Sequence, residues 1–385
     1  MRSKYKVLFV EPVGGHRGMH YYDFALCQAL WEEGVDLKLL TCDETEDKGF
    51  AFPVERPFQA IYGPRKIVLR GWNYLLALGR IIQDLPPRPY LVHLHYFHIP
   101  LLDFLFVAFL KGRGAKIIIT AHDVVPFDLS FISKAILGWI YKAADRVILH
   151  AESNREEMLS LYSLHEDRLA VVPMGHYATL GLKRFSQEEA KGRLGLPQGS
   201  KIVLFFGQIK KVKGLDHLLK AFPILTPNHP EALLLVVGPL WKEDPSRYEP
   251  LIAALGDKVM TRFEYVSDEE MSLYFSAAEV VVLPYTKVYQ SAVLFMAFTF
   301  SRPVVASAVG GLAEVVEEGQ TGYLVPPGDE VALAQAIDKV LSDKMAAEEM
   351  GRRAREMVEE RFSWERIAQE TKRVYEEVVA QEEGR

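Results

Sequence analysis

The stretch RPVVASAVGGLAEVVEEGQTGYLVPPGDEVALAQAI, residues 302–337, contains the alternation of strands and helices that decides the fold class. A short apolar run ends at Ser307, Gly310 and Gly311 turn the chain, and Glu314 lies in the first turn of the next helix. The segment EEGQTGYLVPPGD then predicts a final short strand. Such alternation is typical of parallel sheets with helices on both faces. The stretch therefore predicts an α/β fold.

The same alternation runs through the whole chain and restarts once. Strands are predicted in the first half at KVLFVEP, DLKLLT, LVHLHY, KIIITAHD, RVILHA and RLAVVP. After the turn-rich LGLPQGS they resume at KIVLFFG, ALLLVVG, KVMTRFEYV, EVVVLPY, PVVAS and GYLVP. We expect two doubly wound Rossmann-like domains, residues 1–180 and 181–385. Ligands of such sheets bind beyond the carboxyl ends of the strands, so the site is expected in the loops that follow them.

Composition narrows the class of protein. The 385 residues are 49% hydrophobic and 25% charged, and the net charge of −6 argues against a nucleic-acid binder. Cys27 and Cys42 show neither a disulfide framework nor metal-ligand spacing, which favours a reducing cytoplasm. The longest apolar stretch, residues 99–110, contains Asp103 and is too short to span a bilayer.

The loop in FFGQIKKVKGLDHLL concentrates positive charge at the start of a helix. Gly207 and Gln208 follow the strand, and Lys210, Lys211 and Lys213 precede the helix that Gly214 opens. A helix N-terminus already favours anions, so these lysines predict a phosphate clamp. The alternative is a solvated surface loop.

The segment VYQSAVLFMAF, residues 288–298, predicts a helix that is apolar on every side and therefore buried. It nevertheless opens with Gln290 and Ser291, which suggests that its N-terminus faces a ligand. A second glycine loop, EPVGGHRGMHYY, carries Gly14 and Gly15 between a strand and a helix. Its spacing is not the dinucleotide fingerprint, so an anion site and a plain tight turn both stay open.

These stretches resemble glycosyltransferase family 4, a family of retaining, nucleotide-sugar-dependent enzymes with the GT-B fold. SRPVVASAVGGLAEVVEEGQTGYLVPPGD is similar to the family signature, and FFGQIKKVKGLDHLL to its donor-diphosphate loop, usually G-R-L-x-x-x-K-G. RFEYVSDEEMSLYFSAAEVVVLPY, ITAHDVVP and ERFSWERIAQETKRVYEE match other parts of the family pattern. The resemblance implies two domains that face each other across a cleft. A last helix, about residues 364–385, is expected to cross back to the first domain.

The resemblance also implies roles for single residues. Lys213 would neutralise the leaving diphosphate, and His122 would reach the donor sugar from the first domain. Gln290 is not part of the family pattern, but its donor amide would orient the sugar. For His122 the alternative is a buried histidine bonded to the backbone. Donor-binding residues would be Gly15, Gly207, Gln208, Lys210, Gly238, Pro239, Tyr265, Val266, Ser291, Ala292 and Val293. The chain has no D-x-D triplet, so we expect neither a metal nor another cofactor.

The chain departs from the family where two glutamates eight positions apart are usual. Those positions fall at Val288 and Met296, and Gln208 replaces the arginine of the diphosphate loop. Each lost hydrogen-bonding partner costs about 1–3 kcal/mol, so the pair would weaken donor binding by roughly 10²- to 10⁴-fold without substitutes. Gln290 and Ser291 are the expected substitutes for the glutamates. Lys210 would supply the missing cation.

Residues 62–83, YGPRKIVLRGWNYLLALGRIIQ, combine four basic residues, a tryptophan and no acid. The pattern suggests a helix that contacts an anionic membrane surface, which would make the enzyme peripheral to the membrane. The alternative is a helix packed on its own sheet with a solvated basic face. With membrane contact, the acceptor would be a lipid-linked sugar or glycan in envelope or exopolysaccharide synthesis.

Two other functions remain open beside a metal-independent retaining hexosyltransferase. The missing glutamates would also suit an inactive subunit that binds a nucleotide sugar and regulates a partner. A GT-B-fold epimerase acting on a nucleotide sugar would need an acid–base pair. No Asp or Glu lies between Glu279 and Glu314, which argues against that function.

Overall fold

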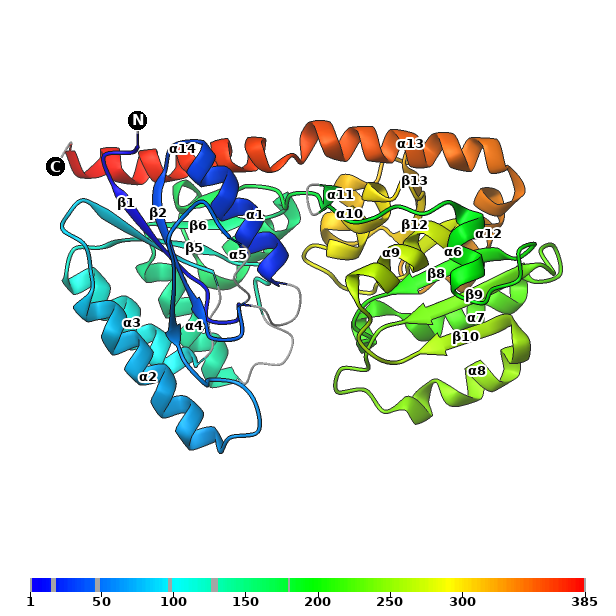
Figure 1. Ribbon diagram of the computed structural model, residues 1–385, viewed down its shortest axis with the longest axis horizontal. Helices are drawn as coiled ribbons and strands as arrows, with labels where there is room; N and C mark the ends of the chain where they lie inside the picture. Colours follow the sequence, from blue (N-terminus) through cyan, green and yellow to red (C-terminus); the bar gives the residue numbers. More distant parts are fainter. Residues whose placement is uncertain are drawn as a thin grey trace. The chain divides into compact units, whose positions relative to one another are not determined.

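The computed structural model describes residues 2–14, 19–45, 49–95, 99–125, 131–178 and 181–383. The chain forms two compact units (Figure 1). Unit 1 comprises Met1–Gly175 with Ser363–Arg385, and unit 2 comprises His176–Phe362. Each is built on a sheet whose strands are all parallel, so the predicted pair of doubly wound α/β domains is confirmed.

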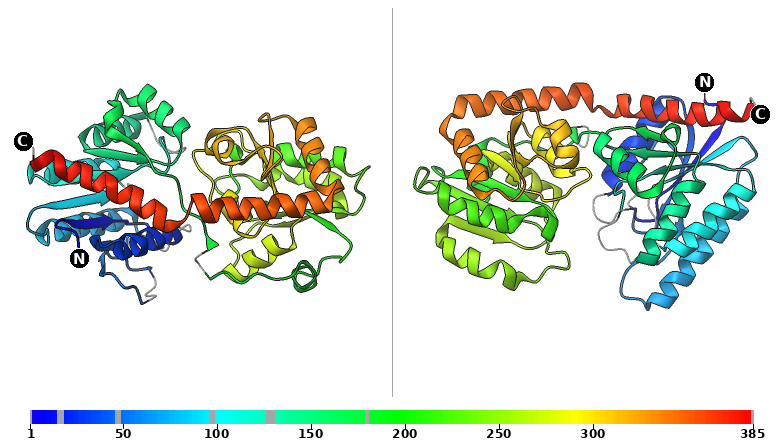
Figure 2. Two further views of the ribbon diagram at one scale, coloured as in Figure 1. Left: turned by 90° about the horizontal axis from the view of Figure 1, so that it is seen from above. Right: turned by 180° about the vertical axis from the view of Figure 1, so that it is seen from behind.

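In the described part of unit 1, seven strands lie in the order β3-β2-β1-β4-β5-β6-β7. The strands are β1 (Lys6–Val10), β2 (Asp36–Cys42), β3 (Val54–Phe58), β4 (Tyr90–Leu94), β5 (Lys116–Thr120), β6 (Arg146–Leu149) and β7 (Leu169–Val171). The helices are α1 (Met19–Glu32), α2 (Ile67–Gln83), α3 (Pro100–Gly112), α4 (Phe131–Ala143), α5 (Glu152–Tyr162) and α14 (Trp364–Glu383). Helix α3 packs between α2 and α4, while α14 runs beside α1 (Figure 2).

The central strands of unit 1 are nearly continuous apolar runs because both faces of the sheet are covered. In β1, Val7 pairs with Leu37 of β2 on one side and with Leu91 of β4 on the other. His93 in β4 is a polar residue within these runs; it is buried, and both of its ring nitrogens have partners, the Tyr375 hydroxyl at 2.7 Å and the Thr120 hydroxyl at 2.8 Å. Through Tyr375, this network ties α14 to the sheet of unit 1.

In unit 2 the described strands lie in the order β10-β9-β8-β11-β12-β13. They are β8 (Lys201–Phe206), β9 (Ala232–Val237), β10 (Val259–Arg262), β11 (Val280–Leu283), β12 (Val304–Ser307) and β13 (Gly322–Val325). The helices are α6 (Gln187–Arg193), α7 (Leu215–Leu225), α8 (Glu249–Leu255), α9 (Asp268–Ala277), α10 (Ala292–Thr299), α11 (Gly310–Val315), α12 (Glu330–Ser342) and α13 (Lys344–Arg361). One core joins α7 and α12 to β8, β9 and β11. The buried helix predicted within residues 288–298 is α10, whose last six residues are all buried.

Candidate functional site

The predicted donor-binding residues of unit 2 lie in loops that follow its strands. Gly207, Gln208, Lys210 and Lys213 follow β8; Gly238 and Pro239 follow β9; Tyr265 and Val266 follow β10; Gln290, Ser291, Ala292 and Val293 follow β11. Because all strands are parallel, their carboxyl ends meet at one edge of the sheet. The structure therefore gathers these residues at one end of unit 2, where open α/β sheets bind ligands.

Two glycines let the loops after β8 and β9 pack backbone against backbone. Gly207 has φ +101° and Gly238 has φ +134°, and a Cβ on Gly238 would lie 2.2 Å from the carbonyl oxygen of Gly207. A Cβ on Gly207 would lie 3.1 Å from Val293 Cγ2 and 3.9 Å from Lys213 Nζ. The start of α10 and the Lys213 ammonium thus lie beside the same bare stretch of backbone, which a ligand could approach closely.

Lys213 ends a short 3₁₀ turn directly before α7. Its Nζ donates a hydrogen bond to the Tyr285 hydroxyl at 3.0 Å and lies 4.6 Å from the centre of that ring. Within the described chain no carboxylate forms an ion pair with this ammonium, so its charge stays available to an anion. The turn also depends on Gly214, at φ +64°, where a Cβ would lie 2.0 Å from the Pro284 carbonyl oxygen.

Tyr285 is a functional candidate that the sequence analysis missed. Its side chain is almost fully buried at the end of β11 and orients Lys213 through an uncharged hydroxyl. The sequence LPY at the end of the strand could have pointed to Tyr285, but a tyrosine at that position is equally compatible with packing in the core. On the outer side of the same loop, the Gln208 amide donates to the Tyr265 hydroxyl at 3.4 Å, and Tyr265 is exposed.

Some of the polar groups at the start of α10 form hydrogen bonds with one another. Ser291 is the N-cap, and its Oγ accepts from the Leu294 N–H at 3.4 Å, while its own N–H donates to Gln290 Oε1 at 3.0 Å. The N–H groups of Ala292 and Val293 open the helix and have no acceptor within it. No hydrogen bond from the Gln290 NH₂ group reaches a described residue. The NH₂ of Gln290 and these two N–H groups are therefore the donors this helix start can offer an anion or a sugar.

Two consecutive glycines, Gly310 and Gly311, pack against the backbone just before α10. Gly310 has φ +48°, and a Cβ there would lie 1.9 Å from the carbonyl oxygen of Val288. A Cβ on Gly311 would lie 2.7 Å from the Tyr289 carbonyl oxygen and 3.0 Å from Gln290 Oε1. The Gly311 N–H also donates to the Tyr289 carbonyl at 3.2 Å. The backbone before α10 therefore rests directly on the start of α11, which fixes where Gln290 lies.

In unit 1, His122 lies within a chain of histidines. Its Nε2 is 3.2 Å from His95 Nδ1, and its Nδ1 is 3.0 Å from His150 Nε2. Burial and the neighbouring His95 and His150 hold the pKa of His122 well below its usual range, so the ring is neutral. Both ring nitrogens of His122 thus face other histidines. The sequence predicted either a contact with the donor sugar or a hydrogen bond to the backbone, and neither prediction included these histidines. The sugar contact stays a prediction, and Gly15, the other predicted residue of this unit, lies outside the described residues.

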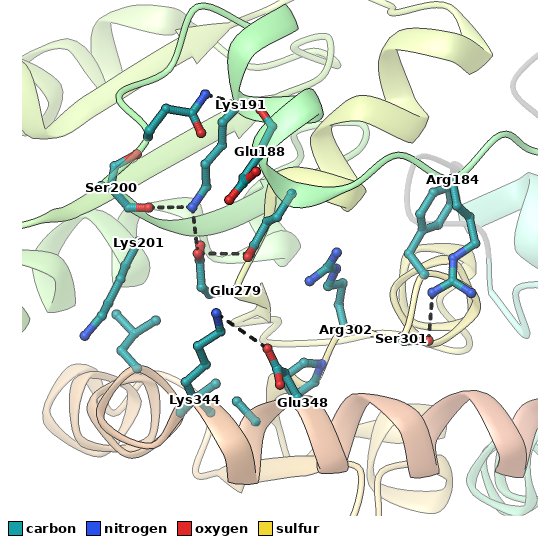
Figure 3. A pocket seen from close by; sticks show the side chains of 18 residues that line it. Arg184, Glu188, Lys191, Ser200, Lys201, Glu279, Ser301, Arg302, Lys344 and Glu348 are labelled. Carbon is teal, nitrogen blue, oxygen red and sulfur yellow. Dashed lines mark hydrogen bonds and ion pairs between the residues drawn. The ribbon is translucent and has the colours of Figure 1, made fainter.

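A cavity of about 480 Å³ lies elsewhere in unit 2 (Figure 3). Its wall includes Lys201 at the start of β8 and Pro303 just before β12, so it opens near the amino ends of the strands. Lys191 donates there to the Ser200 carbonyl at 2.7 Å and pairs with Glu279 at 2.9 Å. The cavity is thus remote from the strand-end loops and is not the donor site that the sequence predicts.

The exposed side of α2 in unit 1 carries large apolar side chains as well as the basic Arg80. Ile67, Val68 and Trp72 are 75%, 78% and 58% exposed. Further exposed apolar residues of α2, α3 and α4 are Leu69, Leu75, Leu76, Leu101, Leu105, Phe109 and Trp139. No helix of the described residues has both the length and the apolar character needed to cross a membrane.

Two sequence profiles together match most of the chain. The one described as Glycosyl transferases group 1 matches residues 186–357, and the one described as Glycosyltransferase Family 4 matches residues 17–176. The chain belongs to this glycosyltransferase family, which confirms the resemblance read from the sequence.

Named relatives agree with this assignment. D-inositol 3-phosphate glycosyltransferase of Streptomyces avermitilis is 34% identical over 248 residues, which are 61% of this chain and 52% of that protein. The chain spans about half the length of this relative and of its Streptomyces scabiei counterpart. Sucrose-phosphate synthase of Thermosynechococcus elongatus superimposes with a TM-score of 0.77 at 25% identity, covering 98% of this chain and 100% of that one. HepE of Anabaena, solved with UDP-glucose, gives 0.75 at 18% identity, covering 97% and 99%, and these structures confirm the GT-B fold.

Proposed function

We propose that this protein is a retaining hexosyltransferase that takes its sugar from a nucleotide-diphosphate sugar bound at the strand-end loops of unit 2. The observation that carries the proposal is the placement of Lys213, Gly207 and the start of α10 around one exposed stretch of backbone. An ammonium without a carboxylate partner and a helix N-terminus both favour a diphosphate. Family membership supplies the class of donor.

The chemistry requires stabilisation of charge on the leaving group. Breaking the bond between sugar and diphosphate builds negative charge on the leaving oxygens, and fixed donors stabilise that charge as it develops. Lys213 supplies a cation, and the N–H groups of Ala292 and Val293 supply a helix N-terminus. We propose that these groups suffice without a metal on the diphosphate. The acceptor would attack on the face that the diphosphate leaves, as the family's retaining outcome requires.

Gln290 and Ser291 are proposed to replace the family's two glutamates. Met296, at one glutamate position, is buried in α10, and Val288, at the other, presses its carbonyl against Gly310. Gln290 has an NH₂ group to offer a sugar hydroxyl, and the Ser291 hydroxyl, which caps α10 as an acceptor, can still donate.

A thermal-shift panel of uridine-, guanosine- and adenosine-diphosphate sugars should identify the donor. A ligand that binds only the native state raises its apparent stability, by about 2.7 kcal/mol at a concentration 100-fold above Kd. We expect one base to raise the melting temperature and Gln290→Ala to lose that rise. A panel in which no nucleotide sugar shifts the melting temperature would contradict the donor site.

The main alternative is an inactive subunit that binds a nucleotide sugar, motivated by the absent glutamates. The same panel, followed by a measurement of nucleoside-diphosphate release from the donor that binds, separates the two functions. Binding with release supports the transferase, whereas tight binding without release, in the presence of membrane extracts as a source of acceptor, supports the regulatory subunit.

We further propose that unit 1 meets an anionic membrane through the exposed faces of α2, α3 and α4, and that the acceptor is lipid-linked, as in envelope or exopolysaccharide synthesis. Exposed Ile67 and Trp72 could enter the interface, while Arg65, Lys66 and Arg70 flank them. Each basic residue near an anionic surface contributes about 1 kcal/mol.

Flotation with vesicles that contain phosphatidylglycerol tests this surface. We expect the wild type to float, and replacement of Arg65, Lys66 and Arg70 by serine to weaken binding by roughly 100-fold. Trp72→Ser should weaken it through lost apolar burial. Leu161→Ser is the matched control, because Leu161 is 52% exposed on α5 and lies outside this surface. Equal flotation of all variants would contradict the proposal.

A further inference from the structure

Unit 1 contains three buried side chains whose arrangement neither the sequence motifs nor the proposed transfer explains. Glu11 directly follows β1, His95 directly follows β4, and Asp23 lies on α1. Their residues are 0%, 2% and 1% exposed. Strands β1 and β4 are neighbours in the sheet, so the fold brings together residues that lie far apart in the sequence.

The three side chains converge on one point. His95 Nδ1 lies 2.8 Å from Asp23 Oδ1 and 3.4 Å from Glu11 Oε2. One atom from each residue can be chosen so that all three lie within 4.8 Å of one another. His122 Nε2 approaches the same His95 nitrogen at 3.2 Å. Glu11 Oε2, Asp23 Oδ1 and His122 Nε2 therefore all lie near His95 Nδ1, and that nitrogen can donate only one proton.

Hydrogen bonds within the protein do not satisfy this group. Glu11 Oε1 accepts from the Val13 N–H at 2.7 Å, but Glu11 Oε2 and both Asp23 oxygens are buried without a well-formed hydrogen bond. No lysine or arginine of the described residues pairs with either carboxylate. Buried carboxylates in native proteins normally have hydrogen-bond partners, paired cations or a metal. Among the described residues, the cationic partner of both carboxylates is His95.

Asp23, Glu11 and His95 shift one another's pKa values. Burial and the charge of Glu11 raise the pKa of Asp23 to about 7. Burial lowers the pKa of His95, but the carboxylates of Asp23 and Glu11 outweigh it and raise the pKa to about 9. In the metal-free group, His95 is therefore protonated and its charge lies between the two carboxylates.

From this geometry we infer that Glu11, Asp23 and His95 bind one divalent transition-metal ion, with Zn²⁺ the best match. Two carboxylates and an imidazole are ligands that Zn²⁺ accepts at about 2.0–2.2 Å, which places neighbouring ligand atoms roughly 3.3–3.5 Å apart in a tetrahedron. The distances from His95 Nδ1 are 3.4 Å to Glu11 and 3.2 Å to His122, which fit this range, and 2.8 Å to Asp23, whose carboxylate would move outward by roughly 0.5 Å on metal binding. His122 or a water molecule would complete the set.

The ion would neutralise the buried carboxylates and tie α1 to the ends of β1 and β4. The donor diphosphate is proposed to bind unit 2, and for it the sequence predicts no metal. The site lies wholly within unit 1, and the observations behind it do not rest on the proposed transfer reaction. The proposed ion takes part in no reaction, so its role would be to stabilise unit 1.

Metal analysis of protein prepared without a polyhistidine tag tests the inference directly. We expect about one zinc or other transition-metal ion per chain in the wild type, and loss of that ion in Asp23→Asn and in Glu11→Gln. Asp103→Asn is the matched control, since Asp103 is also a buried carboxylate of unit 1 but bonds to the Ile99 N–H at 2.8 Å and to the Tyr74 hydroxyl. The control should keep its metal.

A second measurement uses only the wild type, so the test survives if a variant does not fold. Chelation with EDTA should lower the melting temperature by roughly 5 °C or more, and added Zn²⁺ should restore it. Calorimetric titration of the chelated protein with Zn²⁺ should show one site. Protein that is metal-free as purified, binds neither Zn²⁺ nor Mn²⁺ stoichiometrically and melts at the same temperature with EDTA would overturn the inference and leave a buried imidazolium between two carboxylates.

Discussion

Lys213→Ala is expected to reduce the rate of nucleoside-diphosphate release by roughly 10²- to 10³-fold, with the fold intact. Removal of a single preorganised group that stabilises developing charge typically costs this much. Lys213 has the Tyr285 hydroxyl as a partner and no described carboxylate, so its positive charge is directed to the ligand. Its side chain is only partly buried, so truncation should leave the melting temperature nearly unchanged.

The matched control for this prediction is Lys211→Ala. Lys211 belongs to the same short turn, but it is exposed, and its backbone N–H is held by Glu243 at 2.7 Å. A general loss of positive charge near α7 would slow both variants alike, whereas a specific contact from Lys213 slows only one. A near-wild-type rate for Lys213→Ala would remove this lysine from the mechanism.

The placement of the donor loops was predictable because it depends on local rules. A glycine after a parallel strand lies at the carboxyl edge of the sheet whatever the rest of the fold does, so Gly207 and Gly238 could be assigned from their position alone. The burial of α10 followed in the same way from its lack of charge. These inferences need only strand order and hydrophobic pattern, both of which the sequence contains.

Contacts between loops were not predictable, because they depend on which strands become neighbours. Tyr285 meets Lys213 only because β11 lies beside β8 in the sheet. Glu11 and His95 likewise meet because β4 is inserted next to β1. A sequence spacing of 84 positions gives no hint of that pairing.

The exposed face of α2, proposed to meet a membrane, was predictable only in part. The sequence predicted an amphipathic basic helix, but it could not say whether the apolar side chains of α2 would face the sheet or solvent. Tyr74, Ala77 and Leu78 turn inward, while Ile67 and Trp72 remain exposed. Exposed large apolar side chains gathered on adjacent helices are unusual on a soluble surface and mark an interaction site.

Gly310→Ala is the second change with a large expected effect, because it acts on both stability and donor binding. Alanine at φ +48° costs about 1–2 kcal/mol by itself. The added Cβ would also lie 1.9 Å from the Val288 carbonyl oxygen, so the backbone before α10 must move. We expect a total loss of roughly 2–4 kcal/mol in the free energy of unfolding, measured by urea denaturation.

That movement should displace Gln290 and weaken binding of the donor at least about tenfold, since 1.4 kcal/mol corresponds to a factor of ten. Gly319→Ala is the control that separates the cost of a positive φ from the displacement of the backbone before α10. Gly319 has φ +68° and would have nothing within 4 Å of its Cβ, so the variant should lose only the backbone term and bind the donor normally. Equal effects of the two variants on donor affinity would mean that the Val288 contact does not position Gln290. A selective loss in Gly310→Ala would place the double glycine among the residues that shape the donor site, because its backbone packs against Val288, Tyr289 and Gln290.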